Sequence, residues 1–257
     1  MSLPKVALAT LIVMAAAATT AVAQPKPKSA CGVKYLPLVV GNKWSYVPAT
    51  PPVSPNESQA RGVPVQPKLV VVEVKEVTTE GTKTVVKLDE TIDDRTIHTS
   101  ITCGAGVFEP SLDSFFYAGE PGGYFGVELG PIQRILKDVE SGPSKPWTSL
   151  WREDVITTWK RTPEPGMTID LGAGKLEIEH IYKLGAAETI NVNFKQGISA
   201  VRLTVEMTGR VGITGIDKVF EMPATTNGMW FADGVGLVQV NNSQFQAFQL
   251  NEANLVK

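Results

Sequence analysis

Apolar and polar residues alternate along much of the chain with a period of two. Val201, Leu203, Val205 and Met207 alternate with polar or charged residues between positions 201 and 208. This spacing is typical of an antiparallel strand with one face against a core and the other in water. Further strand-like runs lie at 68–79, 82–92, 96–103, 154–161, 174–184, 187–194, 215–222, 229–240 and 244–250.

The first of these runs contain a hairpin and a strand whose faces can be assigned. Glu80-Gly81 separates the runs at 68–79 and 82–92, and a two-residue break of this kind closes a hairpin. In the next run, Cys103 shares a face with the isoleucines, whereas His98 lies on the opposite face. We therefore expect Cys103 in the core and His98 in water.

One segment departs from the period of two. Four apolar residues between Ile132 and Val139 recur at helical spacing, Pro131 suits a first helical turn, and Gly142 suits a stop. This pattern predicts one short helix near residues 131–141. The predicted fold class is therefore all-β, a mainly antiparallel curved sheet or open barrel, with that single helix.

The N-terminus predicts export. Lys5 precedes an apolar stretch of residues 6–18, and Ala21-Val22-Ala23 is a small-residue cleavage site. The stretch is shorter than the roughly 20 residues of a membrane-spanning helix. We expect a signal peptide at 1–23, no transmembrane span after its cleavage, and a periplasmic or extracellular protein. The remaining segments are predicted as a β half at 24–110 with a proline-rich loop at 48–67, an aromatic and glycine-rich segment at 111–150, and a second β half at 151–257.

The charge of the chain excludes one class of partner. The formal net charge is −2, and no run of Lys and Arg occurs. Nucleic-acid binding needs clustered basic residues that displace counterions. We therefore expect no nucleic-acid partner.

The chain has two cysteines, Cys31 and Cys103. An even number in an exported chain favours a disulfide, which in the chain-entropy model contributes roughly 4 to 5 kcal/mol for a loop of this size. A free reactive thiol is the alternative. Lipid attachment at Cys31 is disfavoured because Lys28 stands where an aliphatic residue is expected.

The two halves share short patterns. Aligning Gly81 with Gly197 and Gly104 with Gly234 gives two different offsets, so either a duplication with an insertion or chance would explain the likeness. Alternate glycines such as Gly234 and Gly236 admit positive φ, a bulge, or a ring packed over bare backbone. We interpret the stretch 229–240 as scaffold, with Trp230 lying against backbone or other rings.

A search for catalytic or metal-binding patterns gives no enzyme class. The segment beginning at Gly172 resembles a phosphate loop, but Ile169 replaces its first glycine and Leu176 its hydroxyl residue. His180 shares a strand face with apolar residues, which favours a core histidine. Acidic residues at 89–94 could collect Ca²⁺, yet their spacing fits no known loop, and a charged hairpin tip is usually just solvated. We expect no enzymatic activity, cofactor or metal site.

Five aromatic residues in the middle segment are the candidate ligand-binding residues. They are Phe115, Phe116, Tyr117, Tyr124 and Phe125. Clustered rings of this kind either bind an apolar molecule or fill a core.

The stretches PLVVGNKWSYV (37–47) and GMWFADGVGLVQV (228–240), together with the hairpin-like run ETINVNFKQGISAVRL (188–203), carry a resemblance. The chain resembles secreted bacterial proteins of uncharacterised function that have a G-N-x-W-x-Y start and a W-x-A-x-G-V-G-L-V finish. The resemblance implies an exported antiparallel β protein, distantly similar in architecture to LolA/LolB-like carriers, whose curved sheet holds acyl chains. It implies no catalytic residues.

Two functions are compatible with these expectations. The first is a non-catalytic binding or carrier protein whose partner is an apolar small molecule, a lipid or another envelope-derived ligand, bound on the sheet's concave face or by the aromatic segment. The second is a structural or interaction module of the cell envelope, in which the same rings plug the end of a barrel or meet an envelope protein.

Overall fold

The computed structural model describes residues 29–31, 35–49, 67–104, 107–118, 127–137, 150–161, 172–242 and 247–256. The expected signal peptide, residues 50–66 of the proline-rich loop, and the candidate ligand residues Tyr124 and Phe125 lie outside these ranges.

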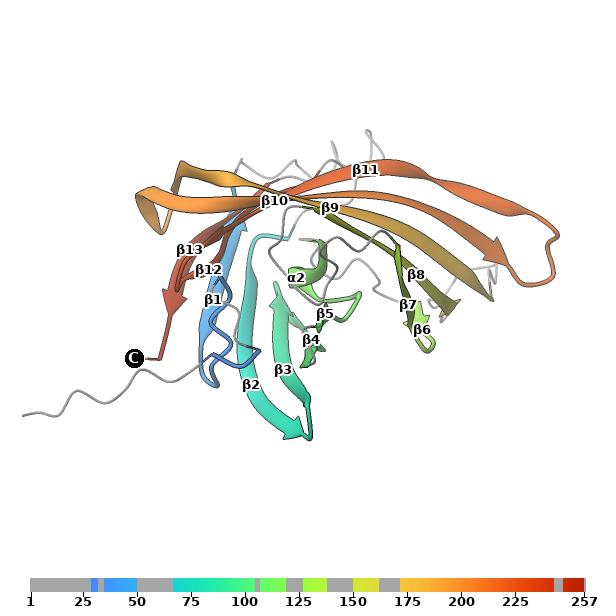
Figure 1. Cartoon of the computed structure of the whole chain (residues 1–257), viewed down its shortest axis with the longest axis horizontal. Helices are drawn as coiled ribbons and strands as arrows, with labels where there is room; N and C mark the ends of the chain where they lie inside the picture. The colour runs from blue at the N-terminus through green and yellow to red at the C-terminus, as the bar shows by residue number, and fades with distance from the viewer. Residues whose placement is uncertain are drawn as a thin grey trace, which may run out of the picture.

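The described strands form one antiparallel sheet of 13 strands (Figure 1). In chain order they are β1 (Lys43–Pro48), β2 (Val70–Glu80), β3 (Lys83–Ile92), β4 (Arg95–Gly104), β5 (Val107–Pro110), β6 (Val127–Leu129), β7 (Gln133–Lys137), β8 (Leu150–Arg161), β9 (Ala173–Val192), β10 (Lys195–Ile213), β11 (Val219–Ala232), β12 (Gly236–Asn242) and β13 (Phe248–Asn254). The prediction of a mainly antiparallel β protein is confirmed.

The sheet consists of two meanders that meet in its middle. Its order is β5-β4-β3-β2-β1-β13-β12-β11-β10-β9-β8-β6, with β7 pairing with β8 outside this path. The first and last described strands, β1 and β13, pair antiparallel with each other. The expected N-terminal and C-terminal halves therefore lie in one continuous sheet.

Strand curvature gives the molecule an arched shape. Figure 1 shows the long strands β9, β10 and β11 as a roof, with β1, β2 and β3 descending at one side and β8 at the other. The only helix of the described ranges, α2 (Phe115–Ala118), lies under this roof, inside the curve.

The prediction of a helix at 131–141 is wrong for its described part. Residues 133–137 form β7, in which Ile135 is paired with Asp154 of β8. Apolar residues three and four apart do not by themselves select a helix, since an open strand edge offers backbone hydrogen bonds to a neighbouring segment. The short helix lies instead at Phe115–Ala118, within the segment that was expected to be an aromatic loop.

The predicted strand faces and the predicted disulfide are confirmed. Along β4, Ile101 and Cys103 are buried, while the His98 side chain is 82% exposed. Cys31 and Cys103 are joined with a Cα–Cα distance of 5.5 Å, within the range that a disulfide spans. The bond ties the start of the described chain to β4.

Candidate functional site

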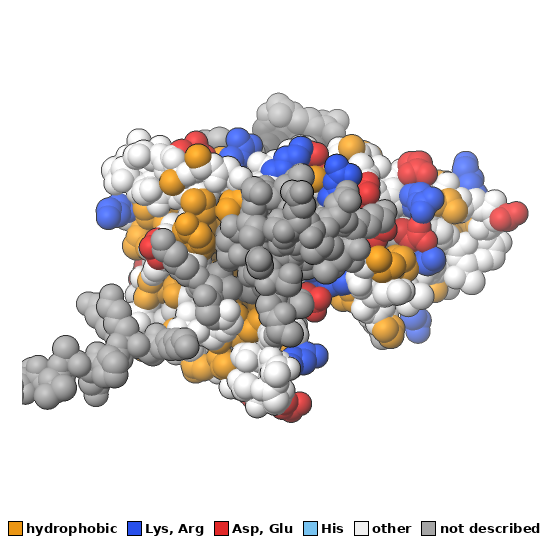
Figure 2. Space-filling view, viewed as in Figure 1, with side chains coloured by type: hydrophobic (Ala, Val, Ile, Leu, Met, Phe, Trp, Pro, Cys, Tyr) orange, Lys and Arg blue, Asp and Glu red, His pale blue; other side chains and the backbone are white. Residues whose placement is uncertain are grey.

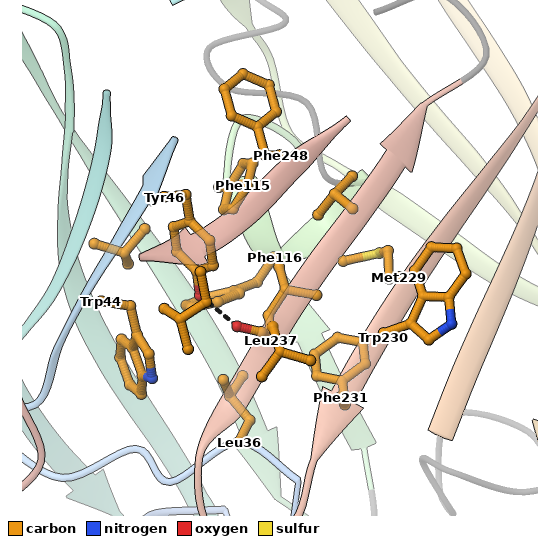
Figure 3. Close-up of a cluster of buried hydrophobic side chains, with 14 of the residues drawn as sticks. Leu36, Trp44, Tyr46, Phe115, Phe116, Met229, Trp230, Phe231, Leu237 and Phe248 are labelled. Carbon is orange, nitrogen blue, oxygen red and sulfur yellow. Dashed lines mark hydrogen bonds between the residues drawn. The ribbon is translucent and has the colours of Figure 1, made fainter. Parts of the chain in front are cut away.

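Two rings of α2, Phe115 and Phe116, lie in the main hydrophobic core (Figure 3), and α2 itself lies on the inner side of the arch. Phe115 is 4.8 Å from Tyr46 and 5.9 Å from Phe248, measured between ring centroids. Phe116 meets Trp44 edge to face at 5.7 Å. Phe115 has no exposed surface, and Phe116 is 4% exposed. These two candidate ligand residues therefore fill the space beneath the sheet.

A buried carboxylate fixes the start of this helix. Glu90 of β3 accepts hydrogen bonds from Thr99 Oγ1 and Ser114 Oγ at 2.7 Å each, and from the Phe115 amide at 2.8 Å. Burial raises the pKa of Glu90 to about 7, although these hydrogen bonds act in the opposite direction. Glu90 thus attaches α2 to the sheet through a carboxyl group that titrates near neutrality.

Glu90 was not singled out from the sequence, which grouped it with the acidic residues at 89–94. The period of two along β3 indicated that Glu90 is buried, because Val86, Leu88 and Ile92 lie on the same buried face as Glu90. Within the described part of the chain, the acidic residues at 89–94 do not gather into a metal site, which agrees with the preference for a solvated hairpin tip. Asp89 pairs with His98 at 2.8 Å, and Asp93 accepts backbone hydrogen bonds from residues 68 and 69.

Tyr117, the third aromatic residue of α2, leads into a buried polar cluster. Its hydroxyl lies 2.8 Å from Nε2 of His180, which stacks on the ring of Tyr182. The Tyr182 hydroxyl donates to Glu153 at 2.8 Å, and Arg134 pairs with the same carboxylate at 3.3 Å. Sequence reasoning found His180 as a core residue but missed Arg134 and Glu153.

Burial decides the protonation of this cluster. It lowers the pKa of His180 to about 3, with a smaller contribution from the Arg134 charge, so the imidazole is neutral at pH 7. Burial also raises the pKa of the Tyr182 phenol well above its ordinary value. Glu153 is 2% exposed and His180 has no exposed surface. The cluster is therefore a satisfied internal network that joins α2, β7, β8 and β9.

The stretch 37–47 and the predicted scaffold stretch 229–240 meet beside the aromatic core. Trp44 donates from Nε1 to the Val235 carbonyl at 2.6 Å. Tyr46 donates to the Leu237 carbonyl at 3.0 Å, the bond drawn as a dashed line in Figure 3. Gly236 has a φ of +115°, and a Cβ there would lie 2.9 Å from Nε1 of Trp44. A ring does cover bare backbone, as expected, but it comes from β1 at the other end of the sequence.

Trp230 lies where the scaffold interpretation predicts. It is 7% exposed, its ring rests against the backbone of Gly228, and the Arg202 guanidinium lies 4.9 Å from the ring centroid. Its indole nitrogen also donates to Glu188. Trp230 therefore belongs to the packed structure of the sheet.

An open groove of about 750 Å³ lies at the far end of the sheet, where β10 and β11 join. We call it the tip groove. Its apolar lining includes Ile132, which is 40% exposed, Ile216 at 50% and Val219 at 59%. Ile156 also lines it and alternates along β8 with the buried Val155 and Thr157, so this part of the lining faces away from the core. Lys175 and Lys218 add two basic groups.

The residues of the tip groove were not found from the sequence as a site. Val219 and Ile216 lie in a run read as a strand, and Ile132 was assigned to a helix. Within the described ranges, no three His, Cys, Asp or Glu residues are grouped to hold a metal ion. The helix in those ranges, α2, does not have the length and hydropathy of a membrane span.

Comparison with known proteins identifies the fold. No protein-family model matches the chain, and no curated protein matches its sequence. A candidate exported protein from Bacteroides fragilis, described as having a YmcC-like fold, aligns with a TM-score of 0.47 and 14% identity over 86% of this chain and 99% of its own. A candidate lipoprotein from Parabacteroides distasonis aligns with a TM-score of 0.51 and 11% identity over 86% of this chain and 98% of its own.

Neither of these two proteins is described as a LolA/LolB-like carrier, so that part of the resemblance stays a prediction. The chain shares the fold of the P. distasonis protein.

Proposed function

We propose that this protein is an exported, non-catalytic carrier that binds an apolar or envelope-derived molecule in the tip groove. The observation that carries the proposal is the exposed apolar lining of the groove. Its volume falls in the range of roughly 300 to 1,000 Å³ that is usual for small-molecule sites. The exposed surfaces of Ile132, Ile216 and Val219 would be removed from water by a bound molecule.

Three features support the exported part of the proposal. The N-terminal sequence has the charge, apolar core and small-residue motif of a signal peptide. The P. distasonis protein of the same fold is described as a lipoprotein. The disulfide between Cys31 and Cys103 is also typical of an oxidising compartment.

The test is native mass spectrometry of protein purified from its own host, followed by organic extraction and identification of any bound molecule. The groove variant is Ile156→Asn, which places an amide in the apolar lining. The matched control is Ile181→Asn, since Ile181 is also half-buried but does not line the groove. A carrier retains a ligand in the wild type and in the Ile181 variant and loses it in the Ile156 variant. Ligand-free wild-type protein, or equal retention by both variants, would contradict the proposal.

A second candidate function, an envelope structural module, is favoured by the placement of α2. Phe115, Phe116 and Tyr117 are at most 5% exposed, as expected of rings that plug the inside of a curved sheet. A ligand reaches these rings only if α2 leaves its place. Ligand retention combined with photo-crosslinking to α2 residues would assign the ligand to the aromatic segment, whereas crosslinking at Ile132 would assign it to the tip groove.

A further inference from the structure

Exposed large apolar side chains are concentrated at one end of the molecule. Of the ten in the described ranges, six lie on β7, on β11 or in the segments that lead into them. Four of these belong to the hairpin tip, which we define as residues 214–222: Ile216, Val219, Phe220 and Met222, each between 39% and 59% exposed. A concentration of this kind marks an interaction surface, whereas single exposed apolar residues need no explanation.

The shape of the hairpin tip restricts what can cover it. In Figure 1 the turn between β10 and β11 is the outermost point of the arch at the end opposite β1 and β13. A projecting turn can contact a flat surface, and the partner then needs no cavity that matches the turn. Figure 2 shows apolar side chains among acidic and basic ones at this end. The surface charge there is therefore of mixed sign.

Backbone amides of the turn have hydrogen-bond partners within the protein, which suits an environment with little water. The amide of Thr214 donates to the Ala173 carbonyl at 2.8 Å, that of Ile216 to Ile213 at 3.1 Å, and that of Lys218 to Ile216 at 2.8 Å. Backbone groups that enter the apolar part of a bilayer without a partner cost several kcal/mol each. Internal hydrogen bonding lowers this cost for the hairpin tip.

Charged side chains at the tip fit a shallow position. Lys218 places its Nζ 5.1 Å from the centroid of the Phe220 ring, so its stem lies along apolar surface while its ammonium group can remain in water. Asp217 lies between Ile216 and Val219, and Glu221 lies between Phe220 and Met222, and these two charges disfavour deep burial. This arrangement suits the headgroup region, where amphipathic elements place an apolar face about 5 to 10 Å into the boundary with the acyl chains.

From these observations we propose that the hairpin tip docks on the surface of a lipid bilayer and inserts its apolar side chains into the headgroup region. The proposal goes beyond ligand binding in the tip groove and does not require it. A carrier whose groove adjoins a membrane-docking turn could receive an envelope-derived molecule directly from the bilayer.

Vesicle co-sedimentation tests the proposal with the mature, disulfide-bonded protein. Vesicles of phosphatidylcholine alone and of phosphatidylcholine with phosphatidylglycerol are compared, each at low salt and in about 1 M NaCl, where exposed charges interact only within about 3 Å. Insertion of apolar side chains predicts binding to both vesicle types that persists in salt. Binding only to the anionic vesicles, lost in salt, would overturn the proposal, as would no binding at all, which would leave a protein partner for this surface.

The test variant is Phe220→Asp, with Phe194→Asp as the matched control. Phe194 lies in the β9–β10 turn at the opposite end of β10 and is 36% exposed, against 40% for Phe220. Loss of one inserted ring predicts vesicle binding about tenfold weaker for Phe220→Asp. The control should bind like the wild type. Equal binding by both variants would contradict docking through the hairpin tip.

A labelling experiment covers the case in which Phe220→Asp does not fold. Both native cysteines are in the disulfide, so Ile216→Cys and Phe194→Cys each offer one thiol for a polarity-sensitive fluorophore. Vesicles should shift the emission of the label at 216 to shorter wavelength and leave the label at 194 unchanged. Equal shifts, or none at 216, would contradict the proposal.

The two proposals fail separately. Phe220 does not line the tip groove, so Phe220→Asp should keep any co-purified ligand while losing vesicle binding. Ile156→Asn should lose the ligand while binding vesicles like the wild type. An absent ligand with intact vesicle binding would contradict only the carrier function.

Discussion

The two ends of β11 have similar hydropathy but opposite surroundings. At its start, Val219, Phe220 and Met222 are between 39% and 59% exposed, whereas at its end Met229, Trp230 and Phe231 are at most 7% exposed. β11 pairs with β10 at both of its ends, but only its residues 227–232 also pair with β12 on the other side. Rings from β1 and α2 cover the inner core at that end (Figure 3). Apolar composition therefore does not determine burial along this strand, because burial depends on which elements lie over each face.

The largest effect is expected at the buried end, for Trp44→Ala. The substitution removes a fully buried ring from above Gly236 and leaves the Val235 carbonyl without its donor. We expect a loss of about 3 to 5 kcal/mol in the free energy of unfolding. Urea denaturation of the purified variant measures it. A loss below about 1 kcal/mol would mean that the site collapses around the missing ring.

Trp230→Ala tests the outer face of the same end. Its ring is packed between Gly228 and Arg202, and its indole nitrogen donates to Glu188. We expect a loss of about 3 kcal/mol, at the lower end of the range for a buried aromatic residue, because Arg202 can move over the vacated surface. Thermal unfolding beside the wild type provides the measurement. An unchanged midpoint would show that this ring does not contribute to the scaffold.

Glu90 is expected to make the free energy of unfolding depend on pH. Its pKa is raised from 4.5 to about 7 in the folded protein, so the folded state binds the proton more tightly than the unfolded state does. The contribution of Glu90 to the free energy of unfolding is fully present below about pH 4.5. It decreases by about 3 kcal/mol as the pH rises to about 7.

The measurement is the free energy of unfolding of wild type and Glu90→Gln between pH 4.5 and 8. His180, whose pKa is lowered to about 3, contributes stability above pH 6.5 that is lost as pH falls. This contribution is common to both proteins and cancels in their difference. The wild type should lose stability relative to Glu90→Gln as pH rises. A constant difference across the range would contradict a raised pKa at Glu90.

The smallest effect is expected at the exposed end, for Phe220→Ala. The ring is 40% exposed and lies outside both buried clusters of the described residues. We expect a change of about 0.5 kcal/mol or less in the free energy of unfolding, as for most surface substitutions. The same urea experiment checks it. A loss comparable to that of Trp44→Ala would remove the contrast between the two ends of β11.

Local pattern predicted the strands well because a period of two is imposed by the strand itself. Along β4 the period placed Ile101 and Cys103 inward and His98 outward, as the structure has them. The same rule applied to β3 would have placed Glu90 beside Leu88 and Ile92 in the core. It was missed because neighbouring acidic residues suggested a solvated turn. Over its described part, the helix predicted at 131–141 was wrong because β8 offers a pairing edge that a single segment's pattern does not reveal.

The candidate site was only partly accessible from sequence. Phe115, Phe116 and Tyr117 were recognised as an aromatic cluster, but whether they meet a ligand or fill a core depends on what lies beneath the sheet. The tip groove unites Ile132, Ile156 and Val219, which are distant in sequence and were assigned to three different predicted elements. No local signal joins residues that only neighbouring strands and a turn bring together.

The sequence by itself determined the antiparallel β class, the inward and outward faces of the strands and the pairing of the two cysteines. Each follows from strand geometry, or from the number of cysteines and the compartment the leader indicates. Tertiary structure alone decided that Trp44 covers Gly236, that Glu90 fastens α2, and that one half of β11 is buried while the other is exposed. These features depend on contacts between segments far apart in the chain, and the free energy of such contacts is set by burial and hydrogen bonding in the assembled fold.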